Sequence, residues 1–102
     1  MIDVVYDRKA LRLSVRGHAH SGEAGRDLVC AAASMLVYTL ASDASQMPGE
    51  KEIALAEGDA VISCRPVHGM QAVTTLVFDA VCAGFDVLAQ AYPENVRYCV
   101  QG

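Results

Sequence analysis

"LRLSVRGHAHSGEAGRDLVCAAAS", residues 11–34, passes through three different patterns of side chains. Its first seven residues alternate apolar and polar, with Leu11, Leu13 and Val15 on one face, which is typical of a half-buried strand. A glycine-rich segment follows, and from about residue 27 the chain is almost continuously apolar as far as Tyr38. The stretch therefore predicts a strand, a loop and a long, largely buried helix in direct succession.

The rest of the chain supplies partners for this strand and this helix. Pro48 and Gly49 end the long helix, and a Glu57-Gly58-Asp59 turn lies inside a strand hairpin. The predicted elements are strands at 2–6 and 11–17, a helix at 27–46, a hairpin at 51–65, a helix at 69–91 and a strand at 95–100. This ββαββαβ order predicts a single α+β domain over residues 1–102, a two-layer sandwich with two helices on one face of a mostly antiparallel sheet.

Composition excludes several classes of function. The 102 residues are 53% hydrophobic and carry a formal net charge of −4, which argues against a general nucleic-acid-binding protein. The N-terminal residues lack the basic and apolar regions of a signal peptide. No apolar run approaches the roughly 18 to 20 residues that span a bilayer. We therefore expect a cytoplasmic protein that binds neither nucleic acid directly nor membranes.

The four cysteines lie at positions 30, 64, 82 and 99 and form no Cys-x-x-Cys pair. Their spacing gives no support to a structural zinc site, and in the cytoplasm they remain reduced. Free cysteines are usually small buried side chains. We expect this of Cys64, Cys82 and Cys99, and only Cys30 has surroundings that suggest chemistry.

Cys30 is expected in the first turn of the long helix. Asp27 is a good N-cap residue, which places Cys30 at the third helical position among N–H groups that lack helical partners. Such groups and the helix dipole favour a thiolate, and they can stabilise an oxyanion beside the sulfur. Ser34 follows one turn later on the same face.

His18 follows the predicted second strand, across the glycine-rich loop from Cys30. A histidine beside a thiolate can act as general base and then protonate a leaving group. Strict alternation places His18 on the polar face of the sheet, so the strand must twist or bulge near Gly17 for the two to meet. A solvated His18 and an inert Cys30 are the alternative.

Two further interpretations remain open at this stage. His18, His20 and Cys30 are ligand types that suit zinc, and a metal could bind there. Alternatively, the acidic domain could be a non-enzymatic interaction module that binds a basic protein by charge complementarity, which under the family resemblance described below would be a ribosome-assembly module that binds a ribosomal protein.

The block formed by Gly17-His18, a loop, and Asp27-Leu-Val-Cys30-Ala-Ala-Ala-Ser34 resembles the signature of the ribosomal-processing cysteine protease family, Prp. The resemblance extends over essentially the whole chain. It implies a cysteine endopeptidase, a thiol protease of ribosome biogenesis. In that family the enzyme removes the N-terminal extension of large-subunit ribosomal protein number twenty-seven. The resemblance also implies a homodimer.

The resemblance implies a role for each matching residue. Cys30 is the nucleophile and His18 the base and acid of a catalytic dyad, which needs no cofactor or metal. Gly17, Asp27 and Ser34 support the site, with Asp27 as the helix cap. The predicted substrate loop consists of Ala19, His20, Ser21, Gly22, Glu23, Ala24, Gly25 and Arg26.

Overall fold

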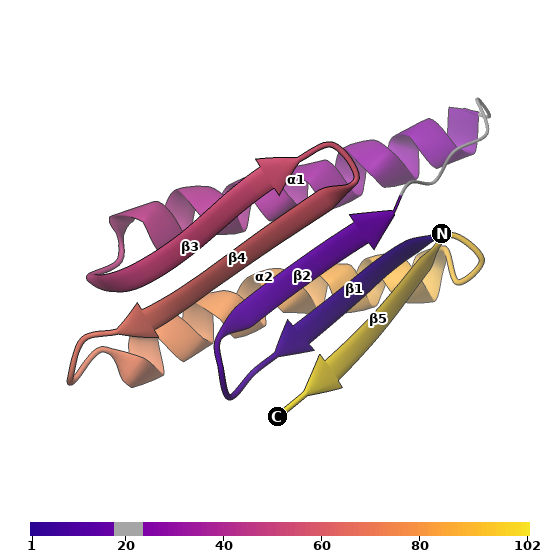
Figure 1. The fold of residues 1–102 in the computed structure, drawn as a ribbon. Helices are drawn as coiled ribbons and strands as arrows, with labels where there is room; N and C mark the ends of the chain where they lie inside the picture. Colours follow the sequence, from indigo (N-terminus) through magenta and orange to yellow (C-terminus); the bar gives the residue numbers. More distant parts are fainter. Residues whose placement is uncertain (18–23) are drawn as a thin grey trace.

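A computed structural model describes the backbone of residues 1–17 and 24–102, together with the side chains of residues 1–17 and 28–102. These described residues form five strands and two helices in the predicted ββαββαβ order, and Figure 1 shows their arrangement. The elements are β1 (Ile2–Asp7), β2 (Arg12–Gly17), α1 (Ala24–Gln46), β3 (Gly49–Ala56), β4 (Asp59–Pro66), α2 (Gln71–Ala91) and β5 (Val96–Gln101).

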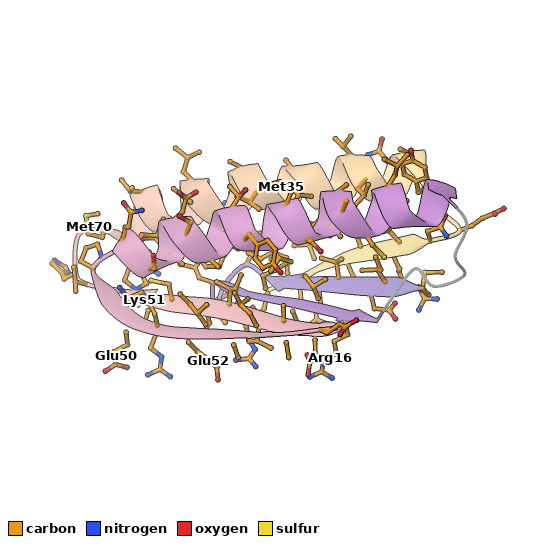
Figure 2. The ribbon with its side chains drawn as sticks, turned by 90° about the horizontal axis from the view of Figure 1, so that it is seen from above. Arg16, Met35, Glu50, Lys51, Glu52 and Met70 are labelled. Carbon is orange, nitrogen blue, oxygen red and sulfur yellow. The ribbon has the colours of Figure 1, made fainter. Side chains whose placement is uncertain are left out.

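The five strands form one sheet in the order β3-β4-β2-β1-β5. All neighbouring pairs are antiparallel except β1 and β5, which are parallel. Both helices lie on the same face of this sheet (Figure 2). α1 contacts β3 and β4, whereas α2 contacts β4 and β5. The predicted two-layer α+β sandwich is therefore confirmed.

The core lies between the sheet and the two helices. Val4, Leu13 and Ile62 point inward from neighbouring strands and are each 1% exposed. Leu40 of α1 and Phe85 of α2 meet them from the helical layer and are fully buried. Burial of each such side chain contributes about 1.5–3 kcal/mol to stability. The alternation predicted for β2 thus has the expected physical cause, because one face of the strand is dry.

Leu11 departs from the predicted strand at 11–17. It belongs to the turn between β1 and β2 and has a φ of +53°, which is rare for a bulky residue. Its N–H donates to the Arg8 carbonyl at 3.3 Å, and its carbonyl accepts from the Cys64 N–H at 3.1 Å. The left-handed backbone costs about 1–2 kcal/mol, which burial of the side chain at 1% exposure offsets.

A cluster of polar side chains fastens β1 to α2. The Tyr6 hydroxyl donates to Asp79 Oδ1 at 2.7 Å, and Arg8 donates to both carboxylate oxygens of Asp79 from Nε and Nη2. These bonds from Arg8 hold the pKa of the Asp79 carboxyl below its usual range. Burial raises the pKa of the Tyr6 phenol. Asp79 is therefore held as a carboxylate between the two layers.

The opposite face of the sheet carries charged side chains, and Figure 2 shows Arg16, Glu50 and Glu52 pointing away from the helices. Cross-strand ion pairs form on this open face, with Arg12 to Glu52 at 2.8 Å and Arg16 to Asp59 at 3.4 Å. Ionic side chains are costly to bury, so this face is suited to solvent.

The two helices contradict the expectation that no apolar run in the chain is long enough to span a membrane. By length and composition, Leu28–Gln46 and Gln71–Ala91 are each long and apolar enough to do so. Each helix contributes fully buried residues to the core, which accounts for part of this apolar character. The outer helical layer also exposes large apolar side chains, namely Leu28, Met35, Tyr38, Val73, Leu76 and Val87.

Candidate active site

Gly17 ends β2 with a φ of +100°, a backbone conformation that favours glycine. A Cβ at this position would overlap the backbone carbonyl of Met1. Two independent restraints thus require glycine immediately before His18. The φ of Gly17 departs from that of an extended strand, and the predicted placement of His18 on the polar face of the sheet lies outside the described residues.

The turn between β3 and β4 lies beside the end of β2. The Gly17 N–H donates to the Gly58 carbonyl at 3.0 Å, and the neighbouring strand residues Arg16 and Asp59 are paired in register. The sequence predicts this turn but not its contact with Gly17. The contact depends on β2 pairing with β4, which lies far along the chain and leaves no local signal.

α1 begins at Ala24, three residues earlier than predicted. Asp27 is therefore the fourth helical residue and not the N-cap, and Cys30 is the seventh and lies beyond the first turn. Aspartate is favourable both as a cap and within the first turn, so its presence alone does not locate the helix start. Residues 24–26, assigned to the substrate loop, belong to the helix instead.

This earlier start changes the expected oxyanion donors. In an α-helix the carbonyl of the N-cap residue already accepts the first intrahelical hydrogen bond, so the unpaired N–H groups of α1 are those of residues 24–26. The N–H of Cys30 lies within the regular helical hydrogen-bond pattern and is not a free donor. Arg26 precedes Cys30 by about one turn, so the nearest unpaired N–H group lies on its side of the helix.

The Cys30 side chain is half-buried and packs against the core. Its neighbour Val29 is 1% exposed and anchors this turn of α1 to the sheet. Ser34 lies one turn further along α1 and its side chain is exposed. The sulfur of Cys30 is thus fixed by core packing on one side and accessible on the other.

The position of Cys30 relative to the β3–β4 turn follows from an anchor at the other end of α1. Lys51 Nζ donates to the carbonyls of Ser45 and Met47, at 3.2 and 2.7 Å, which fixes the start of β3 against the end of the helix. β3 runs antiparallel to α1 (Figure 1). The five residue-to-residue steps from Lys51 to Ala56 cover about 17 Å, the rise of about eleven helical residues.

That distance brings the end of β3 level with about residue 35 of α1. The turn at Glu57-Gly58 continues in the same direction, toward Cys30. The end of β2, the β3–β4 turn and the Cys30 turn of α1 are therefore gathered at one end of the sandwich.

The other three cysteines have contrasting surroundings. Burial raises the pKa of the Cys82 thiol to about 12 and also raises the pKa of Cys64. Both side chains are 1% exposed, as expected. Cys99 is exposed on the open face of the sheet, which contradicts the expectation that it is shielded. No described element covers that face.

Several predicted site residues lie outside the described residues. They are His18, Ala19, His20, Ser21, Gly22 and Glu23, together with the side chains of residues 24–27. They include His18, which is the predicted dyad partner of Cys30. They also include both histidines of the alternative zinc site, His18 and His20.

Comparisons with known proteins identify what this arrangement is similar to. A family model described as "Cysteine protease Prp" matches residues 1–97. The crystal structure of SMU.848 from Streptococcus mutans is similar with a TM-score of 0.71 and 24% identity, covering 98% of this chain and 91% of that chain. No curated protein matches the chain.

Two structures of the essential ribosomal processing protease Prp from S. aureus are also similar. One contains a covalently linked product peptide and the other a substrate peptide. Each has a TM-score of 0.73 and 20% identity and covers 98% of this chain and 97% of that chain. At these identities the likeness concerns the fold.

Proposed function

The chain belongs to the cysteine protease Prp family, and we propose that its one domain, residues 1–102, processes a ribosomal protein with a dyad of His18 and Cys30. The substrate proposed is large-subunit ribosomal protein number twenty-seven, from which the enzyme removes an N-terminal extension. The proposal rests above all on Cys30, whose half-buried thiol lies at the same end of the sandwich as Gly17, the residue before His18.

The chemistry follows from the two side chains. His18 takes the thiol proton, and the Cys30 sulfur attacks the peptide carbonyl carbon. The tetrahedral intermediate expels the amine, which receives the proton from His18, and leaves a thioester. Water then attacks the thioester with His18 as base, releasing the carboxylate and restoring the thiol. The unpaired N–H groups of residues 24–26 are the proposed oxyanion donors.

Location and assembly complete the proposal. All four cysteines are free thiols, which fits a reducing cytoplasm.

We place a homodimer interface on the outer helical layer, because its apolar side chains are exposed while the other face of the sheet is charged. Sedimentation should then give about twice the 10.8 kDa chain mass, and a monomer at micromolar concentration would contradict it.

The direct test is incubation with ribosomal protein number twenty-seven from the same organism, followed by mass spectrometry of its N-terminus. Wild type should shorten the substrate at one bond, whereas Cys30→Ala and His18→Ala should not. Cys99→Ser is the matched control, because it removes an exposed thiol outside the site and should keep full activity. Normal cleavage by either dyad variant would overturn the mechanism.

A further inference from the structure

β3 is an edge strand with an unusually open outer side. It ends the strand order, and among the described residues no strand pairs with its outer edge. It is eight residues long, contains no proline, and is exposed along its length except at Gly49. Natural edge strands are commonly shortened or interrupted, because unpaired N–H and C=O groups attract another strand. This edge is not protected in these ways.

The groups that face outward can be identified from the sheet register. The Cys64 N–H donates to the Leu11 carbonyl, so it points away from β3. Its partner Lys51 therefore belongs to a non-hydrogen-bonded pair and directs its own N–H and C=O toward the free edge. By alternation the same holds for Ile53 and Leu55. Every second residue of this part of β3, namely Lys51, Ile53 and Leu55, thus directs an unpaired N–H and C=O group to the free edge.

The side chains along this edge follow the same alternation. Figure 2 shows Lys51 pointing from β3 toward α1, whereas Glu50 and Glu52 point from the opposite face. Ile53 and Leu55 lie on the helix-facing side with Lys51, and they remain 36% and 45% exposed. An added strand would therefore find apolar contacts on one face and acidic groups on the other.

The free edge also leads to the proposed active site. β3 runs toward the turn that is fixed to Gly17 by the Gly58 hydrogen bond, and its rise brings that turn toward Cys30. A chain that pairs with Lys51, Ile53 and Leu55 would continue past this turn to the sulfur.

We propose that β3 binds an extended segment of the polypeptide substrate as a sixth strand of the sheet, an inference that rests on the protease function proposed above. Backbone hydrogen bonds to the edge would supply affinity, and the contacts with Ile53 and Leu55 would favour apolar substrate residues at alternate positions. This pairing would hold the scissile bond in an extended conformation beside Cys30.

The first test is Leu55→Pro, which removes an outward N–H without breaking the β3–β4 ladder. Val100→Pro is the matched control on the other edge of the sheet. The carbonyls of Asn95 and Gln101 accept bonds from β1, so by alternation the Val100 N–H also points outward. Val100 is 52% exposed, close to the exposure of Leu55. Thermal melting of both variants checks that they fold equally.

The probe is a fluorescent peptide spanning the N-terminal extension of ribosomal protein number twenty-seven, and anisotropy measures its Kd. In a Cys30→Ala background, Leu55→Pro should raise Kd about three- to tenfold, whereas Val100→Pro should leave it unchanged. The edge proposal would be overturned if Leu55→Pro and Val100→Pro gave equal Kd values. It would also be overturned if the peptide did not bind the Cys30→Ala protein at all. Cleavage by wild type tests the protease function separately, because binding does not require the thiol.

The second test changes the substrate and leaves the protein intact. Peptides N-methylated at single backbone positions lose one donor each, and in a paired strand only alternate donors face β3. Kd should therefore rise with a period of two residues along the paired segment. A rise at consecutive positions, or at none, would refute strand addition even if the unmodified peptide is cleaved.

Discussion

Selective alkylation of Cys30 tests whether its thiol differs chemically from the other buried cysteines. The perturbation is a limiting amount of iodoacetamide at pH 7, applied to a Cys99→Ser background because the exposed thiol of Cys99 would otherwise react. An ordinary thiol with a pKa near 8.5 is about 3% thiolate at this pH. Cys82, with its pKa raised to about 12, is about 0.001% thiolate, roughly three thousandfold less.

Cys64 is disfavoured in the same direction, because burial raises its pKa and its side chain is 1% exposed. Peptide mapping by mass spectrometry should therefore find the first label almost entirely on Cys30. In a His18→Ala variant this labelling should slow, since an imidazolium beside the sulfur favours the thiolate. Labelling of Cys64 or Cys82 at the rate of Cys30 would show that Cys30 is an ordinary buried thiol, and the nucleophile assignment would fail.

Two further outcomes are expected from positions that hold the fold around the site. Gly17→Ala should lower the melting temperature more than Gly69→Ala. Both glycines have a positive φ, but of the two only a Cβ at position 17 would meet a backbone carbonyl, that of Met1. Equal shifts in the melting temperature, measured by calorimetry, would show that the Met1 contact does not add to the cost. Asp79→Asn should destabilise the protein more at neutral pH than in acid. The folded pKa of Asp79 is lowered by Arg8, so its contribution is present above the unfolded pKa of about 3.9 and is lost as pH falls through the folded value. Urea unfolding at pH 7 and pH 3 measures this, and a constant difference between wild type and variant would exclude the ionised pair as its source.

The order of elements is predictable because it is encoded locally. Leu13 and Val15 alternate with polar residues, and the structure buries both. The start of α1 is not predictable from Asp27, since two helical positions favour aspartate equally. Exposure of Cys99 depends on what covers a sheet face, which is a property of the assembled layers.

Residues that order the site are likewise partly local and partly not. The glycine at position 17 is visible in the sequence as part of a motif, but its reason is the carbonyl of Met1, which strand pairing brings beside it. The contact with Gly58 has the same origin. Long-range register, and not local pattern, thus determines the surroundings of the residue before His18.

The closeness of Met1 to Gly17 has a practical consequence for handling the protein. Figure 1 places the N-terminus beside the end of β2 and the C-terminus at the opposite end of the strands. A purification tag fused ahead of Met1 would emerge beside Gly17, at the end of the sandwich where we propose the active site, and would compete there with the substrate. A tag fused after Gly102 would leave that end of the sandwich open, so turnover measured with the two fusions should differ even though the folded domain is the same.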